Sequence, residues 1–163
     1  MKIKRNNIIP ICLIILCLVS CDSKRIYDSY VATSNQSWGR EQAISFSFSV
    51  KDTIEQRHLF INVRNNNDYA FSNLFLITEL SFPNGKKIID TLEYEMTDVS
   101  GKFLGVGLTE IKENKLFYKE NVIFPNSGDY KISISQAMRK NGETEGINAL
   151  DGITEVGFRI EKK

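Results

Sequence analysis

Ile44-Ser45-Phe46-Ser47-Phe48-Ser49-Val50 decides the fold, because apolar and serine side chains alternate strictly along it. Successive side chains of a β-strand point to opposite faces of its sheet, so a period of two predicts one buried and one solvated face. Leu59, Ile61 and Val63 repeat this pattern. Residues 73–82 are apolar at successive positions, which is typical of a central strand covered on both faces.

Turn residues separate this strand from the next one. Pro83-Asn84-Gly85 predicts a hairpin with a type I′ turn, followed by a return strand over 87–96. Further strands are expected at 103–110, 116–124, 130–138 and 153–160. The only helical candidate is a short one at 146–150. Eight short strands predict a single antiparallel, all-β sandwich domain over residues 41–163, with a closed barrel as the alternative.

The first 20 residues read as a secretory leader. Lys2, Lys4 and Arg5 precede an apolar run of twelve residues from Ile8 to Val19. As a helix this run would span about 18 Å, well short of the ~30 Å hydrocarbon core of a bilayer. A membrane-spanning helix is therefore not expected here.

Leu18-Val19-Ser20-Cys21 resembles the lipobox of bacterial lipoproteins, in which the leader is cut before the cysteine and the cysteine is diacylated. We therefore expect cleavage of residues 1–20 and lipidation of Cys21. Several acyl chains hold a protein on a membrane essentially permanently. Residues 21–40, rich in Ser, Asn and Gln, are expected to form the lipidated cysteine and a tether. Lipoproteins of Bacteroidetes that are sent to the cell surface resemble one another in an acidic cluster just after the cysteine. Here Lys24 and Arg25 follow Asp22 and Ser23 instead, which favours a periplasm-facing position.

Cleavage leaves 18 basic against 20 acidic residues, a formal charge of −2. Such a balance does not favour nucleic-acid binding. Cys12 and Cys17 leave with the leader, so no thiol other than Cys21 remains for a nucleophile, a metal site or a disulfide.

Catalytic patterns are sparse. The single histidine, His58, starts a strand and is expected to face solvent rather than act as a base. No GxSxG, Walker loop or calcium loop occurs. Asp90, Glu93, Glu95 and Asp98 are the acids considered for a hydrolase, but charge on an edge strand explains them equally well. We expect no enzyme activity, cofactor, metal or small-molecule substrate.

Five residues are candidates for contacts with a partner or a ligand. Trp38, Tyr69 and Phe71 are aromatic and fall in predicted loops, whereas Arg64 and Arg139 each close a predicted strand. Aromatic side chains exposed together would form a binding patch. The alternative function that follows from this patch is a carbohydrate-binding lipoprotein of the surface or periplasm.

The order of several motifs behind the lipobox resembles the GldH family of gliding-motility lipoproteins from Bacteroidetes. These motifs are residues 63–65, 69–75, 101–107 (GKFLGVG), 124–130 (FPNSGDY), 136–139 and 152–161. Within them, Gly128-Asp129-Tyr130 is similar to a tyrosine corner. The resemblance implies a non-catalytic accessory protein at the outer membrane, associated with gliding and with a protein-secretion system. It implies machinery proteins as partners and brings no cofactor.

Overall fold

The computed structural model describes residues 22–163. The predicted leader and the lipidation of Cys21 lie outside these residues. Within 22–163 no helix is present that is long and apolar enough to cross a membrane.

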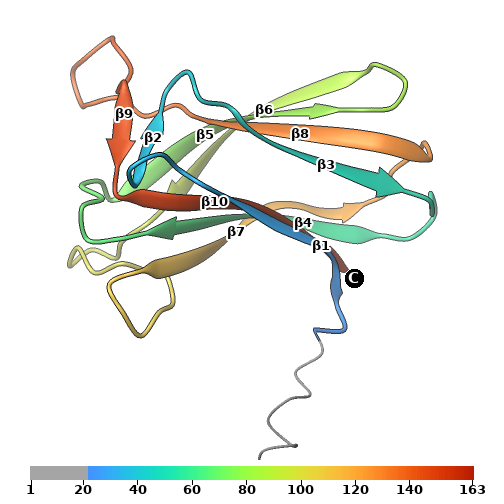
Figure 1. Cartoon of the computed structure of the whole chain (residues 1–163), viewed down its shortest axis with the longest axis horizontal. Coiled ribbons are helices and arrows are strands. Elements are labelled where there is room, and N and C mark those ends of the chain that lie inside the picture. Colours follow the sequence, from blue (N-terminus) through green and yellow to red (C-terminus); the bar gives the residue numbers. More distant parts are fainter. Residues whose placement is uncertain (1–21) are drawn as a thin grey trace, which may run out of the picture.

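Two four-stranded antiparallel sheets pack face to face, as expected for a sandwich (Figure 1). One sheet, sheet A, has the strand order β1-β10-β4-β7, and the other, sheet C, has the order β3-β8-β5-β6. A two-stranded ribbon, β2-β9, closes one end. The strands are β1 (Arg25–Ala32), β2 (Ser37–Gly39), β3 (Ile44–Val50), β4 (Arg57–Asn65), β5 (Asn73–Ser81), β6 (Lys87–Glu95), β7 (Lys112–Val122), β8 (Gly128–Gln136), β9 (Ala149–Asp151) and β10 (Ile153–Lys162).

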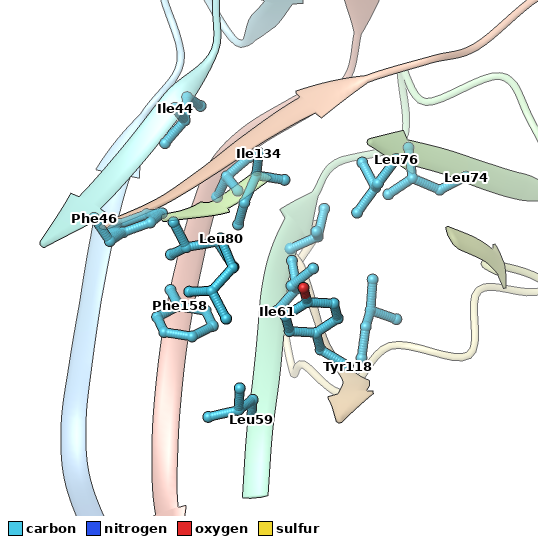
Figure 2. Close-up of a cluster of buried hydrophobic side chains, with 14 of the residues drawn as sticks. Ile44, Phe46, Leu59, Ile61, Leu74, Leu76, Leu80, Tyr118, Ile134 and Phe158 are labelled. Carbon is cyan, nitrogen blue, oxygen red and sulfur yellow. The ribbon is translucent and has the colours of Figure 1, made fainter. Parts of the chain in front are cut away.

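The core lies between the inner faces of the two sheets (Figure 2). Phe46 and Phe48 of β3 project inward and meet Phe158 of β10, with ring centroids 6.3 Å and 5.6 Å from it. The serines between them stay exposed on the outer face. The strict alternation in β3 therefore produces the predicted division into a buried and a solvated face.

The predicted tyrosine corner is present at the start of β8. The buried Tyr130 hydroxyl donates to the Asn126 carbonyl at 2.9 Å and accepts the Asn126 N–H at 3.3 Å. The preceding loop is thereby tied to the sandwich.

The hairpin between β5 and β6 is confirmed, but its predicted turn type is wrong. Positive φ occurs at Gly85 (83°) and not at Asn84. The Gly85 N–H donates to the Phe82 carbonyl at 3.0 Å, and the Phe82 N–H donates to that of Lys86 at 2.8 Å. Pro83 thus occupies the second position of a tight turn, and Gly85 supplies the left-handed residue that follows it.

Three other expectations are wrong. The predicted tether is contradicted over its described part, residues 22–40, because β1 pairs along its length with β10 and β2 pairs with β9. Residues 103–110 form no strand beyond isolated bridges. Residues 146–150 are not helical, since β9 begins at Ala149. In addition, β5 is central in its sheet, but its outer face is only partly covered, and Ile77 remains 42% exposed.

The strand directions give the sandwich two distinct ends (Figure 1). One end, here called the anchor end, holds the start of β1, the end of β10 and the loops 51–56, 82–86 and 123–127. The opposite, distal end holds the loops 66–72, 96–111 and 137–148.

Candidate functional site

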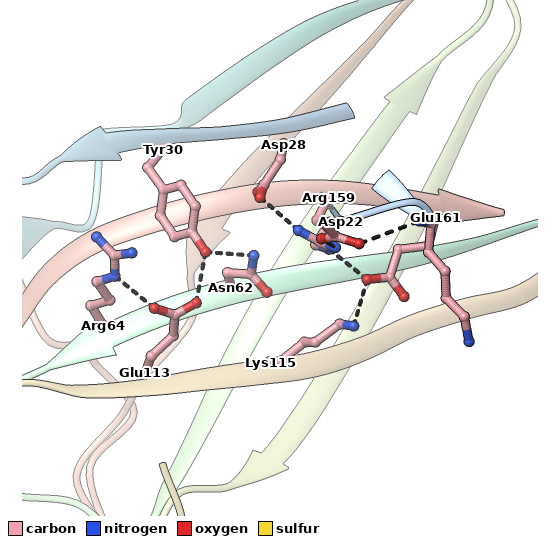
Figure 3. A network of polar contacts seen from close by, with 10 residues as sticks. Asp22, Asp28, Tyr30, Asn62, Arg64, Glu113, Lys115, Arg159 and Glu161 are labelled. Atoms are coloured by element: carbon pink, nitrogen blue, oxygen red, sulfur yellow. Dashed lines mark hydrogen bonds and ion pairs between the residues drawn. The ribbon is translucent and has the colours of Figure 1, made fainter. Parts of the chain in front are cut away.

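A polar network covers the outer face of sheet A (Figure 3). Arg159 of β10 is at its centre and binds the carboxylates of Asp22, Asp28 (2.7 Å) and Glu161 (2.6 Å). Lys115 of β7 reaches Glu161 at 2.7 Å. The Arg159 side chain is only 13% exposed, so this pairing is better protected from solvent than an ordinary surface salt bridge.

A second group in the same network surrounds Tyr30. Its hydroxyl donates to Glu113 at 2.9 Å and accepts from the Asn62 amide at 2.8 Å. Arg64 lies 4.4 Å above the Tyr30 ring and pairs with Glu113 at 3.0 Å and with Glu155. The Tyr30 ring crosses β10 at Gly157, where a Cβ atom would lie 2.7 Å from Tyr30 Cδ1. A side chain at position 157 would therefore displace the Tyr30 ring.

The pKa values of this face follow from burial and pairing. Burial, together with the bond to Glu113, raises the pKa of Tyr30 above its ordinary range. Burial alone would raise the pKa of Glu161, but the bonds from Lys115 and Arg159 outweigh it and lower that pKa. The bond from Arg159 likewise lowers the pKa of Asp22. These carboxyl groups are held in their charged forms.

The loop 96–111, here called the distal loop, exposes apolar side chains. Val99 and Leu108 are fully exposed, Val106 is 82% exposed and Leu104 is 53% exposed. Ile111, at 38%, adds to them. The loop contains the GKFLGVG motif of residues 101–107.

Backbone and side-chain bonds hold this loop in place. The Asp98 carboxylate accepts the N–H groups of Ser100 (2.8 Å) and Lys102 (3.1 Å). The Val106 and Glu113 backbones exchange both hydrogen bonds at 2.8 Å and 2.9 Å. Lys112 Nζ donates to two carbonyls of the loop, at 2.8 Å and 2.9 Å. The exposed apolar side chains thus stand on a fixed backbone.

Close approaches explain the last two glycines of the motif. A Cβ at Gly105 would lie 2.7 Å from Asn114 Oδ1, and one at Gly107 would lie 2.2 Å from the Ile111 carbonyl oxygen. Side-chain atoms do not fit at such distances. Gly101 instead adopts a φ of 84°, a conformation that favours glycine.

A groove of about 900 Å³ opens on the outer face of sheet C, next to the loop 137–148 of the distal end. Phe71, Phe75 and Ile77 contribute its apolar lining, and Arg139 lies on its polar rim. The Ser72 carbonyl accepts the N–H groups of Met96 (2.7 Å) and Thr97 (3.2 Å), which joins the groove wall to the distal loop.

The five candidate contact residues are not brought together. Trp38 and Tyr69 are buried in the core, so their prediction as contact residues is wrong. Trp38 donates to the Gln42 carbonyl at 2.8 Å, and Tyr69 donates to that of Asn73 at 2.6 Å. Phe71 is half-buried in the groove wall and Arg139 is exposed on its rim. Arg64 is fully engaged in the network of sheet A.

The acids considered for a hydrolase lie in different settings. Glu93 and Glu95 are exposed on β6, an edge strand, where Glu93 accepts from the Asn73 amide at 2.9 Å. Asp90 accepts from the Tyr118 hydroxyl at 2.8 Å and pairs with Lys119 at 2.9 Å. His58 is half-buried beside Phe117. In residues 22–163, no cluster of three or more His, Cys, Asp or Glu side chains could hold a metal ion.

Comparison with known protein families identifies the family of this chain. The family model described as "GldH lipoprotein" matches residues 25–160, from the first residue of β1 almost to the end of β10. The chain belongs to the GldH lipoprotein family. GldH is a gliding-motility lipoprotein, so this chain is a membrane-anchored protein of the cell envelope.

Two relatives resemble it over nearly their full length. The gliding motility lipoprotein GldH homolog of Christiangramia forsetii is 56% identical over 148 residues, which cover 91% of this chain and 90% of the relative. The gliding motility lipoprotein GldH of Flavobacterium johnsoniae is 45% identical over 163 residues, which cover 100% and 99%.

Among solved structures, a family GH115 4-O-methyl-alpha-glucuronidase specific for decorated arabinogalactans contains a similar fold. The match has a TM-score of 0.50 at 12% identity and covers 88% of this chain but 18% of the glucuronidase. At this identity the similarity concerns the GldH fold alone.

The sequence does not predict two surfaces of this chain: the polar network on the outer face of sheet A and the exposed apolar side chains of the distal loop. Arg159 carries no local signal of its role, since its three partners come from β1, β10 and the residues before β1. Leu104, Val106 and Leu108 of the distal loop fall within the strand predicted at 103–110, whereas Val99 and Ile111 lie outside it. The glycines at 105 and 107 were the available signal, because glycine inside a predicted strand marks a bulge or a close approach.

Proposed function

We propose that this chain is a non-catalytic assembly component of the gliding machinery and its associated protein secretion. In this proposal, lipid on Cys21 holds the domain at the periplasmic side of the outer membrane, and the distal loop contacts another protein of the machinery. The observation that carries the proposal is the exposure of Val99, Leu104, Val106 and Leu108 on a rigid loop.

The energetics of such a loop favour protein binding. Full burial of one Val or Leu side chain contributes about 1.5–3 kcal/mol. A backbone already fixed by hydrogen bonds loses little conformational entropy on association, so more of this free energy appears as affinity. Apolar side chains gathered on one surface are typical of interaction sites.

The state of the charged groups supports a structural role. Arg64, Glu113, Arg159 and Glu161 are bonded to one another or to neighbouring side chains. They stiffen sheet A between the anchor end and the distal end. Burial of Trp38 and Tyr69 removes two of the three aromatic side chains on which the carbohydrate-binding alternative rested.

The test is a mild-detergent pulldown of the tagged protein from its native membrane, with proteins identified by mass spectrometry. The double variant V106D/L108D should lose gliding or secretion components by at least tenfold relative to the unmodified chain. Ile89→Asp is the matched control, because Ile89 is also exposed (65%) but lies on β6 away from the distal loop. Equal recovery of those components with V106D/L108D would overturn the assignment of the loop.

A further inference from the structure

The anchor end is joined to Cys21 without a spacer. Asp22 is bonded through its carboxylate to Arg159, and its carbonyl accepts the Arg25 N–H at 3.3 Å. Asp22 directly follows Cys21, and consecutive Cα atoms lie about 3.8 Å apart. A flexible linker of 20 residues would instead have an end-to-end distance of about 25 Å. A lipid on Cys21 would therefore hold the folded domain against the membrane surface.

Unpaired cations surround this attachment point. The Lys162 N–H donates to the Lys24 carbonyl at 2.9 Å, which places the two residues side by side, and Lys163 follows. All three side chains are exposed, and within residues 22–163 none of them forms an ion pair. The nearby carboxylates of Asp22 and Glu161 are occupied by Arg159 and Lys115.

An apolar loop tip lies next to these cations. Lys163 Nζ donates to Gln56 Oε1 at 2.7 Å, so the loop 51–56 adjoins the end of β10. Ile54, at the tip of this loop, is 83% exposed. The Asp52 carboxylate accepts the N–H groups of Ile54 (2.8 Å) and Glu55 (3.1 Å), which fixes the tip. Asp52 and Glu55 are the exposed acids of this loop.

We propose that the anchor end is a second membrane contact, with Lys24, Lys162 and Lys163 on anionic phospholipid headgroups and Ile54 in the interfacial layer. This inference rests on the proposed lipidation of Cys21. Cations near an anionic bilayer contribute favourably and additively, and an apolar side chain beside them enters the headgroup boundary. A domain attached at one point could rotate freely, whereas the second contact fixes its orientation.

The fixed orientation has a consequence for the distal loop. The antiparallel strands span the distance between the anchor end and the distal end, and the ten residues of β10 extend over about 33 Å. With the anchor end on the lipid, the distal loop would stand about this far from the headgroups. It would then be accessible to a protein partner.

The test measures which end touches lipid. Full-length lipidated protein is reconstituted in vesicles of phosphatidylethanolamine and phosphatidylglycerol at a ratio of 3:1. A fluorophore is attached at Thr53→Cys, beside Ile54, or at Thr109→Cys in the distal loop. Quenching by a headgroup spin label should be at least threefold stronger at position 53 than at position 109.

Charge reversal supplies the second arm. K24E/K162E/K163E should reduce quenching at position 53 at least twofold. K102E/R139E/K140E removes the same charge from exposed distal positions and should leave it unchanged.

Equal quenching at both positions, or no effect of K24E/K162E/K163E, would overturn the membrane contact while leaving the anchor intact. Failure of the anchor itself gives a different result, because mass spectrometry would then find an unacylated Cys21 and the protein would not enter the vesicles.

Discussion

The anchor end and the distal end use opposite chemistry on the same two sheets. At the anchor end, exposed lysines surround the first residues of β1, and a network centred on Arg159 fastens them to β10. At the distal end, Val99, Val106 and Leu108 stand in solvent on a loop with a fixed backbone. This contrast is the basis of the two proposals, in which one end attaches to a charged surface and the other contacts an apolar one.

The largest effect is expected from Cys21→Ala. Loss of the acyl chains removes the attachment that several chains make essentially permanent, so the protein should move completely to the soluble fraction and gliding should stop. Fractionation and a motility assay check this. Normal motility with a fully soluble protein would contradict the account.

Gly107→Ala should disrupt the distal end while leaving attachment unchanged. The new Cβ would lie 2.2 Å from the Ile111 carbonyl oxygen, so the loop must change its conformation. Recovery of gliding or secretion components in the pulldown should therefore fall at least tenfold. Gly85→Ala is the matched control at the anchor end, where no atom lies within 4 Å and only the positive φ of 83° is strained. Its expected cost is about 1 kcal/mol, without loss of the partner.

Arg159→Met should weaken the fastening of β1. Removing one partner of a poorly solvated ion pair leaves Asp28 and Glu161 without their common cation, and we expect a loss of about 2–3 kcal/mol in the free energy of unfolding. Denaturant unfolding measures it. Lys87→Met, which breaks the exposed pair with Glu79, serves as control and should cost under about 1 kcal/mol.

The pH dependence of stability gives an independent view of the same network. The pKa values of Asp22 and Glu161 are lowered in the folded state. Their contribution is therefore present above the ordinary carboxyl pKa of about 4 and is lost as the pH falls through the folded-state values. Arg159→Met should flatten this acid-side loss. An unchanged slope below pH 4 would show that the network does not set it.

The smallest effect is expected from Tyr130→Phe. The change removes the hydroxyl that satisfies the Asn126 carbonyl and N–H, at a cost of about 1–2 kcal/mol in unfolding free energy. Gliding should persist, because Tyr130 is buried and the change leaves the exposed side chains of the distal loop and the lysines of the anchor end in place. A thermal melt measures the loss of stability, and a motility assay checks that gliding persists.

The sequence predicts strands best where one face of the strand is buried and the other is exposed to solvent. Phe46 and Phe48 mark β3 by simple alternation, and the same signal locates β4, β8 and β10. It fails for β1, where Asp28 bonds to Arg159 and Tyr30 bonds to Glu113, each more than 80 residues away along the chain. A strand whose charged side chains pair with those of neighbouring strands has the same polar composition as a flexible tether, so the sequence alone does not distinguish the two.

The candidate site was predictable only in part. Arg139 and Phe71 do lie at the groove, but Trp38 and Tyr69 fall in segments without strand periodicity and are nevertheless buried, because the short β2-β9 ribbon and the loop 66–72 cover the end of the core. The distal loop escaped prediction for the reverse reason. Its alternating Leu104, Val106 and Leu108 imitate a strand, while close contacts at Gly105 and Gly107 fold it into a loop.

Contact between the distal loop and the machinery is tested by photo-crosslinking in gliding cells, with a photoreactive amino acid at position 108 or, as control, at position 89. We expect an adduct with a gliding or secretion component from position 108, lost in the Gly107→Ala background, and none from position 89. Adducts of equal yield from both positions, or none from position 108 in motile cells, would contradict this contact.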